Sequence, residues 1–232
     1  MENADIGKTL YLAEVGVPLM IRKLISVKDL NVFRIAEGTD RIHHGCNQEW
    51  YPRRLQRLAG CGPTTATNIY LYLTSPQHAP ESEFLQHTLE SSVAQMQELW
   101  KYVTPSFRGV NTTRMFYEPM LEYAQTKGLN VAYRVLEVPK DTAERPKFSE
   151  TLKFVEDGLA ANTPLAFLNL DNGQEKNLDR WHWVTIIGLE YEEDGSSAYA
   201  DILDAGLIKR INFKLWYETT TLGGGLIYFV RS

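Results

Sequence analysis

The stretch "AGCGPTTATNIYLYL", residues 59–73, places Cys61 between two glycines at the point where a helix begins. Pro63 suits a first helical turn, because that turn makes no use of the amide hydrogen that proline lacks. The apolar residues that follow recur at helical spacing up to a Ser-Pro pair: Ala66, Ile69, Tyr70 and Leu73. The stretch therefore predicts a helix whose first turn carries a thiol.

The chain beyond this helix changes character part-way along. Apolar spacing predicts helices over residues 83–103, 112–127 and 147–161, with Asn111 capping the second and Gly128 ending it. Residues 130–138 alternate like a strand. The last third holds short β-rich runs separated by turn residues: "PLAFLNL", "HWVTIIGLEY", "AYADILDA", "KRINF" and "GLIYFV". Helices followed by a strand meander predict an α+β domain with an antiparallel sheet.

Composition narrows the class of protein. The chain has 232 residues, 44% of them hydrophobic and 23% charged, with a net charge of -5. These values are typical of a globular protein with a substantial core, and they disfavour nucleic acid or a membrane surface as the main partner. The apolar residues 9–21 carry Glu14 and Pro18, so they predict neither a membrane span nor a secretory signal. Two cysteines suit a reducing compartment, and we expect a cytoplasmic protein.

The first 45 residues show only weak patterns, with helical spacing around residues 17–30. We therefore divide the chain into an N-terminal extension, residues 1–45, and a main domain, residues 46–232. Phosphate-binding glycine motifs are missing from the sequence, so we expect no cofactor. "HHGC" (His43, His44 and Cys46) offers zinc-type ligands, but their spacing is cramped and no second ligand pair is evident, so we expect no metal.

Cys61 is the candidate nucleophile. The free N–H groups and the dipole of a helix N-terminus favour the thiolate, which is the reactive form of cysteine. The glycines on either side leave room for a substrate carbonyl. The alternative is a small buried hydrophobic residue, which is the commoner fate of cysteine. Position alone does not decide between these readings, so a catalytic partner must be found.

His182 is the candidate partner. It begins the strand "HWVTIIGLEY" after the polar loop "DNGQEKNLDR", and so it stands at an edge of the sheet. An imidazole there could accept a proton from a thiol and return it to a leaving group. The alternative is an ordinary histidine at a strand end, hydrogen-bonded to a backbone carbonyl. The other histidines lie in irregular stretches or inside a predicted helix.

Asp204 is the candidate that orients His182. A hairpin turning near Asp194-Gly195 would bring the end of "AYADILDA" back beside the start of the His182 strand. Asp201 lies nearer the turn and, three residues away, faces the other side of the strand. We therefore expect Asp204 to contact His182 and Asp201 to face solvent.

Acyl transfer also needs a hydrogen-bond donor for the oxyanion. The backbone N–H of Cys61 is one candidate donor. Gln56, in the stretch just before Cys61, is the natural side-chain donor, because a neutral amide donates without titrating. Gln48 is its rival further upstream in "CNQEWYP".

In combination these residues resemble a known family. A Gln, then Cys-Gly-Pro opening a helix, then "HWVTIIG" and "ILDAG" resembles the papain-like cysteine peptidases. The nearest branch is the bacterial double-glycine leader (bacteriocin-processing) peptidases, and the likeness covers residues 48–230. The resemblance implies a helical half, carrying the nucleophile helix, packed on an antiparallel sheet. It also implies Cys61 as nucleophile, His182 as base and then acid, and Asp204 with Gln56 in support.

Three functions remain open at this point. The first is a thiol hydrolase that cleaves peptide or amide bonds of a peptide or protein substrate through a thioester. The second is a papain-like acyltransferase or transglutaminase-type enzyme with the same triad but an acceptor other than water. The third is a catalytically silent binding module on the same scaffold. The presence of Cys61, His182, Asp204 and a glutamine together favours catalysis.

Overall fold

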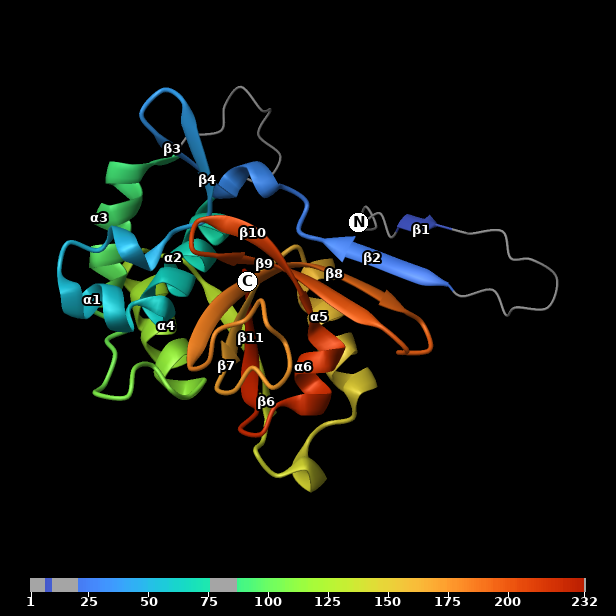
Figure 1. Ribbon diagram of the computed structural model, residues 1–232. Coiled ribbons are helices and arrows are strands. Elements are labelled where there is room, and N and C mark those ends of the chain that lie inside the picture. The colour runs from blue at the N-terminus through green and yellow to red at the C-terminus, as the bar shows by residue number, and fades with distance from the viewer. Residues whose placement is uncertain (1–6, 10–20, 76–86, 232) are drawn as a thin grey trace.

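The computed structural model describes residues 7–9, 21–75 and 87–231. Within this part the chain forms one large antiparallel sheet, a small second sheet and helices on both faces of the large one (Figure 1). The strands are β1 (Gly7–Thr9), β2 (Arg22–Ser26), β3 (Arg34–Glu37), β4 (Arg41–His44), β5 (His87–Thr88), β6 (Val131–Val138), β7 (Leu165–Asn169), β8 (His182–Glu192), β9 (Ala198–Asp204), β10 (Leu207–Asn212) and β11 (Gly224–Arg231). The helices are α1 (Arg54–Ala59), α2 (Cys61–Thr74), α3 (Leu89–Trp100), α4 (Arg114–Thr126), α5 (Phe148–Ala160) and α6 (Phe213–Thr219).

Strand β8 is the centre of the eight-stranded sheet, whose path runs β1-β2-β8-β7-β11-β6. β7 pairs with the first half of β8 and β2 with the second half, while β9 also pairs with β8 and β10 with β9. All of these pairings are antiparallel. The expected α+β class with an antiparallel sheet is confirmed.

Alternation along the central strands divides the core into two layers. Phe167 and Val184 pack with apolar residues of α5 and α6, whereas Leu168 and Trp183 pack with residues of α2 and α4. Figure 1 shows the same arrangement, with α2 and α4 on one side of the sheet and α5 and α6 on the other. Because both faces are covered, β7 is buried along its whole length.

Helix α2 is the most deeply buried of the described helices. From Gly62 to Leu73 all of its residues except Tyr70 are buried, because sheet, α3 and α4 surround it. A helix that is apolar on nearly all sides belongs inside a protein rather than on its surface. The predicted helix of residues 59–73 is thus confirmed, and its first residue, Cys61, is partly exposed at the molecular surface.

Several sequence expectations need correction. Residues 22–26 form strand β2 rather than helix, because Ile25 and its neighbours pair with β8. Gln56 lies in helix α1, not in a loop. Phe213 was expected to end a strand but begins α6, and the side chain of Asn212 caps that helix by accepting from the Leu215 N–H. The signal for α6 was this asparagine cap.

Two helix boundaries also differ from expectation. The helix expected over residues 83–103 is α3, which begins at Leu89 because Thr88 forms a capping box with Ser91. Residues 83–86 lie outside the described part, and His87 belongs to β5 rather than to a helix. In α4 the expected cap Asn111 is wrong, and Thr112 Oγ1 accepts from the Met115 N–H instead. Gly128 does follow the helix, at φ 68°.

The division of the chain at residue 46 remains a prediction. The described residues before it nevertheless pack with the main sheet, because β2 pairs with β8. The backbone N–H of His44, at the end of β4, donates to the carbonyl of Gly206 in the β9–β10 turn. Within the described part of the chain, no helix is long and apolar enough to cross a membrane.

Asn68 in the middle of α2 ties three segments together. Its Oδ1 accepts from the backbone N–H of Cys46 at 2.8 Å, and its Nδ2 donates to Thr185 Oγ1 on β8 at 3.1 Å. Asn68 is 2% exposed, so neither bond competes with water. The segment that carries Cys46 and Gln48 is therefore fixed relative to both α2 and β8.

We predict that Asn68→Ala lowers the free energy of unfolding by about 2 kcal/mol, because it leaves the buried N–H of Cys46 without an acceptor. Urea denaturation followed by circular dichroism measures this difference. Gln125→Ala, an exposed change on α4, is the control and should have little effect. An Asn68→Ala protein as stable as this control would contradict the assignment.

Candidate active site

Cys61 is the first residue of α2, and Gly60 is its N-cap. The amide groups of a first helical turn lack partners within the helix and create a positive potential at its end. No side chain caps this helix, so that potential is directed at whatever lies beside Cys61. The thiol is partly exposed, whereas Cys46 is 2% exposed.

The glycines around Cys61 have a packing role that the sequence did not reveal. A Cβ atom on Gly62 would lie 2.8 Å from a methyl carbon of Val110. A Cβ atom on Gly60 would lie 2.4 Å from the carbonyl oxygen of Gln56 and 2.7 Å from the Tyr51 ring. Both approaches are closer than real side chains tolerate, so the glycines allow the start of α2 to fit against α1 and Val110.

His182 is the first residue of β8 and is held in a defined position. Its Nε2 lies 2.8 Å from Oδ1 of Asp204, the last residue of β9. The preceding residue, Trp181, has φ 54°, which is unusual for a bulky side chain and marks a constrained backbone. Just before it, the carbonyl of Asp179 accepts from Asn169 Nδ2 at 2.5 Å. The structure thus brings His182 and Asp204 together as the hairpin argument predicted.

Asp204 is enclosed and fully hydrogen-bonded. Its Oδ2 lies 2.6 Å from Nζ of Lys209 on β10, while its Oδ1 faces His182. Burial disfavours the carboxylate, but the bonds from His182 and Lys209 outweigh that effect and lower the pKa of Asp204 to about 2. The aspartate therefore stays ionised beside the imidazole at any ordinary pH.

The imidazole of His182 interacts with both Asp204 and Cys61. Burial disfavours the imidazolium form, but the hydrogen bond to Asp204 and the interaction with Cys61 outweigh it and raise the pKa of His182 to about 10. An imidazolium between a carboxylate and a sulfur atom is the arrangement that stabilises a thiolate. The described geometry is therefore compatible with an activated cysteine.

The side chains of Cys61, His182 and Asp204 line one cavity of about 200 Å³. Gln48 lines this cavity as well, in the short 3-10 turn Gln48–Trp50, and its Oε1 is buried without a hydrogen-bond partner among the described residues. Gln56 is not part of this lining, although it lies on α1 immediately before Cys61. Of the two candidate glutamines, Gln48 is therefore the one in the lining of this cavity.

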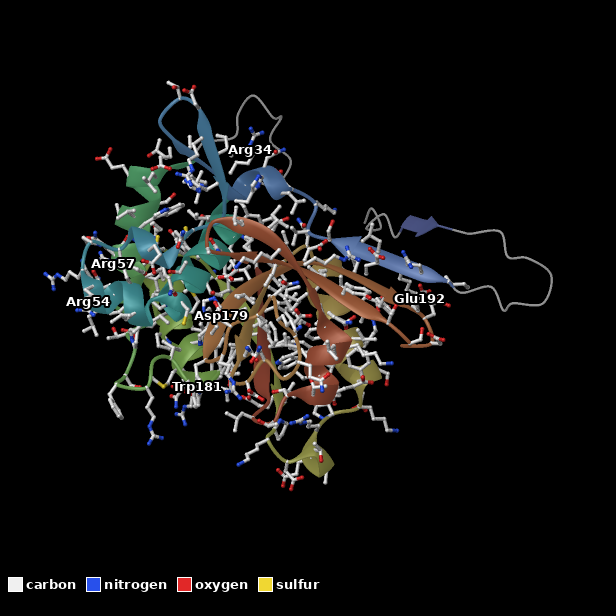
Figure 2. All side chains as sticks on the ribbon, in the orientation of Figure 1. Arg34, Arg54, Arg57, Asp179, Trp181 and Glu192 are labelled. Atoms are coloured by element: carbon white, nitrogen blue, oxygen red, sulfur yellow. The ribbon has the colours of Figure 1, made fainter. Side chains whose placement is uncertain are left out.

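Sequence reasoning missed three charged residues of the cavity, Lys209, Asp179 and Glu49. A signal for Lys209 was present, since a two-residue turn at Ala205-Gly206 pairs residue 204 with 207 and brings residue 209 close. Asp179 is an exposed carboxylate in the loop before β8. Figure 2 labels Asp179 and Trp181, which lie on the side of the sheet that carries α1 and α4.

Asp201 lies away from the cavity, as expected, but it is not simply solvated. Its side chain is one-third exposed and faces Arg210 Nη1 at 3.6 Å. Burial raises its pKa, and the Arg210 charge opposes this rise only in part. Asp201 therefore belongs to the surface of the β9–β10 hairpin rather than to the site.

Potential metal ligands gather at the same place. Ligand atoms of Asp179, His182 and Asp204 lie within 4.8 Å of one another. The Lys209 ammonium, 2.6 Å from Asp204, already supplies a positive charge there and occupies one of the carboxylate oxygens. This arrangement fits an orienting aspartate better than a metal ligand.

Of the candidate ligands in "HHGC", His43 makes other side-chain contacts. His43 Nε2 lies 2.8 Å from Oε2 of Glu37, and its ring packs edge-on against Trp50. Cys46 is buried, and its backbone is bonded to Asn68. In the part of the chain that the structure describes, they form no metal-ligand group with His44. Both cysteines are free.

Comparisons with known proteins add little to this geometry. No family profile and no curated protein matches the chain. Among solved structures, a crystal structure of UfSP from C. elegans aligns with a TM-score of 0.47 and 10% sequence identity. The alignment covers 92% of this chain and 38% of that one, so the chain spans well under half of the UfSP chain. A likeness of this degree carries no argument about fold or activity.

We predict that iodoacetamide at about pH 6 modifies Cys61 well before Cys46, since a thiol held beside an imidazolium is reactive there. Cys46 is buried, and burial raises the pKa of its thiol. Peptide mapping by mass spectrometry measures the two rates. Equal labelling, or faster labelling of Cys46, would contradict an activated Cys61.

A second prediction concerns acid. Because the pKa of Asp204 falls from 3.8 to about 2 on folding, this carboxylate stabilises the fold above pH 3.8, and the contribution is lost as pH falls through about 2. The difference in unfolding free energy between wild type and Asp204→Asn should therefore shrink by about 2 kcal/mol between about pH 5 and about pH 2. Urea titrations across this range measure it. A difference independent of pH would refute the linkage.

Proposed function

We propose that this chain is a cysteine peptidase with a papain-like arrangement, cleaving a peptide or amide bond of a peptide or protein substrate. The observation that carries the proposal is the single cavity in which Cys61, at a helix N-terminus, meets a His182 that is hydrogen-bonded to the buried Asp204. Nucleophile, proton carrier and orienting group come from α2, β8 and β9, so only the folded chain assembles them. The two free cysteines support a reducing compartment, and we keep the cytoplasm as the proposed location.

The proposed reaction has two stages. In the first, the Cys61 sulfur attacks the substrate carbonyl carbon, and the His182 imidazolium donates its proton to the leaving amine as the carbon–nitrogen bond breaks. This leaves a thioester on Cys61 and a neutral imidazole. In the second, His182 accepts a proton from water as the water oxygen attacks the thioester, and the carboxylic acid departs as the thiolate reforms. Asp204 keeps the ring in place during both stages.

These two reaction stages explain why His182 needs a partner that stays charged. The ring must hold a proton before the first stage and accept another in the second. The low pKa of Asp204, about 2, keeps a negative charge 2.8 Å from Nε2 throughout. Asp204 therefore fixes the ring orientation and stabilises each imidazolium without itself exchanging a proton.

We assign the oxyanion donors to the backbone N–H of Cys61 and the side-chain amide of Gln48. The N–H of Cys61 lies in the first turn of α2, where it has no partner within the helix. Gln48 is the glutamine that lines the cavity with Cys61. Gln56, the alternative, lies on α1 and is not among the residues that line this cavity.

The test of this function begins with the nucleophile. Cys61→Ser should abolish cleavage of a peptide library, because a serine hydroxyl beside this imidazolium is not ionised. His182→Gln should lower the rate to a similar level, since the two residues act as a unit. Mass spectrometry of the products measures cleavage. Undiminished activity in Cys61→Ser would overturn the proposal.

The oxyanion assignment makes a separate prediction. Gln48→Ala should lower kcat by about 100-fold, the typical effect of losing one oxyanion donor, with a smaller change in KM. Gln56→Ala is the matched control and should stay within about threefold of wild type. The reverse ranking of the two variants would move the donor role to Gln56.

The nature of the acyl acceptor can be read in the same assay. A probe that reacts with Cys61 is competed with lysate peptides. A peptide that acylates Cys61 blocks labelling by the probe, and this loss of labelling identifies the acyl donor. Release of that acyl group as a free acid supports hydrolysis, whereas its appearance on an amine identifies an acyltransferase. A chain that never forms the thioester would be a binding module, which contradicts the proposed function.

A further inference from the structure

Lys209 is a charged residue of the cavity that the proposed reaction does not use. It lies on β10, three residues beyond the turn that follows Asp204. The turn itself is formed by Ala205 and Gly206 at φ 53° and 76°, values typical of a type I′ hairpin turn. This tight turn pairs Asp204 with Leu207, so Lys209 becomes a diagonal cross-strand neighbour of Asp204.

The carboxylate of Asp204 is shared between two donors. Oδ1 faces His182 Nε2 at 2.8 Å, and Oδ2 faces Lys209 Nζ at 2.6 Å. A carboxylate held at one oxygen can still rotate about its last bond, whereas one held at both oxygens presents a fixed lone pair to its partner. Lys209 therefore restricts the one motion that would change how Asp204 addresses His182.

The surroundings increase the importance of this contact. The Asp204 side chain is 8% exposed, so water gives it little support. The groups that face this part of the cavity are His182 on β8, Cys61 on α2, Asp179 in the loop before β8 and Glu49. Apart from the Cys61–His182 pair and Lys209, the charged side chains that line the cavity are all carboxylates. Lys209 is the cation that offsets their negative charge.

From this geometry we infer that Lys209 is a positioning residue: its ammonium group fixes the Asp204 carboxylate in the orientation that holds His182 against Cys61. The inference rests on the proposed function, since it assigns Lys209 a part in the same site. It differs from an ordinary surface ion pair, which contributes little and affects nothing beyond its two partners. Here the effect of Lys209 is expressed at Cys61, a residue with which it forms no bond.

A double-mutant cycle on the intact chain tests the inference. The readout is the rate constant for Cys61 alkylation by iodoacetamide, which needs no substrate. Lys209→Met should lower that rate about fivefold, because the carboxylate and the ring lose their fixed orientation. Lys209→Arg, which retains a cationic donor, should restore most of it. In an Asp204→Asn background, Lys209→Met should have no further effect, because its charged target is gone.

Two further variants serve as controls, one for the loss of any ion pair and one for the unfolding of Lys209→Met. Lys127→Met removes another ion pair, in which Nζ lies 2.7 Å from Oε1 of Glu98 on α3, and should leave the alkylation rate unchanged. Lys209→Leu, which also lacks a hydrogen-bond donor, replaces Lys209→Met if thermal denaturation shows that the methionine variant is unfolded. The cycle therefore compares folded proteins in every case.

The outcomes separate the two proposals. A slower Lys209→Met protein, rescued by arginine and silent in Asp204→Asn, supports the positioning role. An unchanged rate in folded Lys209→Met or Lys209→Leu, or an equal decrease with and without Asp204, overturns it while the peptidase proposal stands. If wild-type Cys61 couples to Lys209 in this way but cleaves no peptide, the proposed function fails and the positioning role stands.

Discussion

The hydrogen bond between His182 and Asp204 depends on how the central strand begins and how its neighbour ends. β8 must start where β9 finishes, and the hairpin between them achieves this because the two strands pair antiparallel along most of their length. The irregularity between Ile186 and Gly188 adjusts the register before the strands reach the site. The same strand also packs on α2 and pairs with β2 and β7. The site is therefore an edge of the core rather than an addition to its surface.

Burial gives the site its electrostatic character. Asp204 and His182 lie where water is scarce, so each stabilises the other as an ion. The opposite directions of their pKa shifts, downward for Asp204 and upward for His182, express this mutual dependence. Lys209 supplies a second cation next to the carboxylate, so the buried charges are balanced in the folded chain before any substrate binds.

Sequence reasoning succeeded where the signal was local or followed from a simple topology. Residues 59–73 predicted α2, because their apolar spacing is helical and Pro63 suits a first helical turn. The contact between His182 and Asp204 followed from strand alternation and one turn at Gly195, whose φ is 71°. Sequence reasoning failed for α1 and β2, because these elements are short and depend on partners distant in sequence. The choice between Gln48 and Gln56 as oxyanion donor stays a prediction: proximity along the chain favoured Gln56, whereas Gln48 is the glutamine that lines the cavity.

The sequence by itself determined the class of fold, the thiol at a helix N-terminus, and the histidine and aspartate that a hairpin would bring together. Those inferences depend on periodicity and on neighbouring residues, which the chain displays directly. Only the tertiary structure decided which glutamine lines the cavity with Cys61, that Lys209 holds the second oxygen of Asp204, and that Gly60 and Gly62 serve packing against Tyr51 and Val110. Each of these depends on atoms brought into contact from separate segments, and their distances are set by the packing of the whole core.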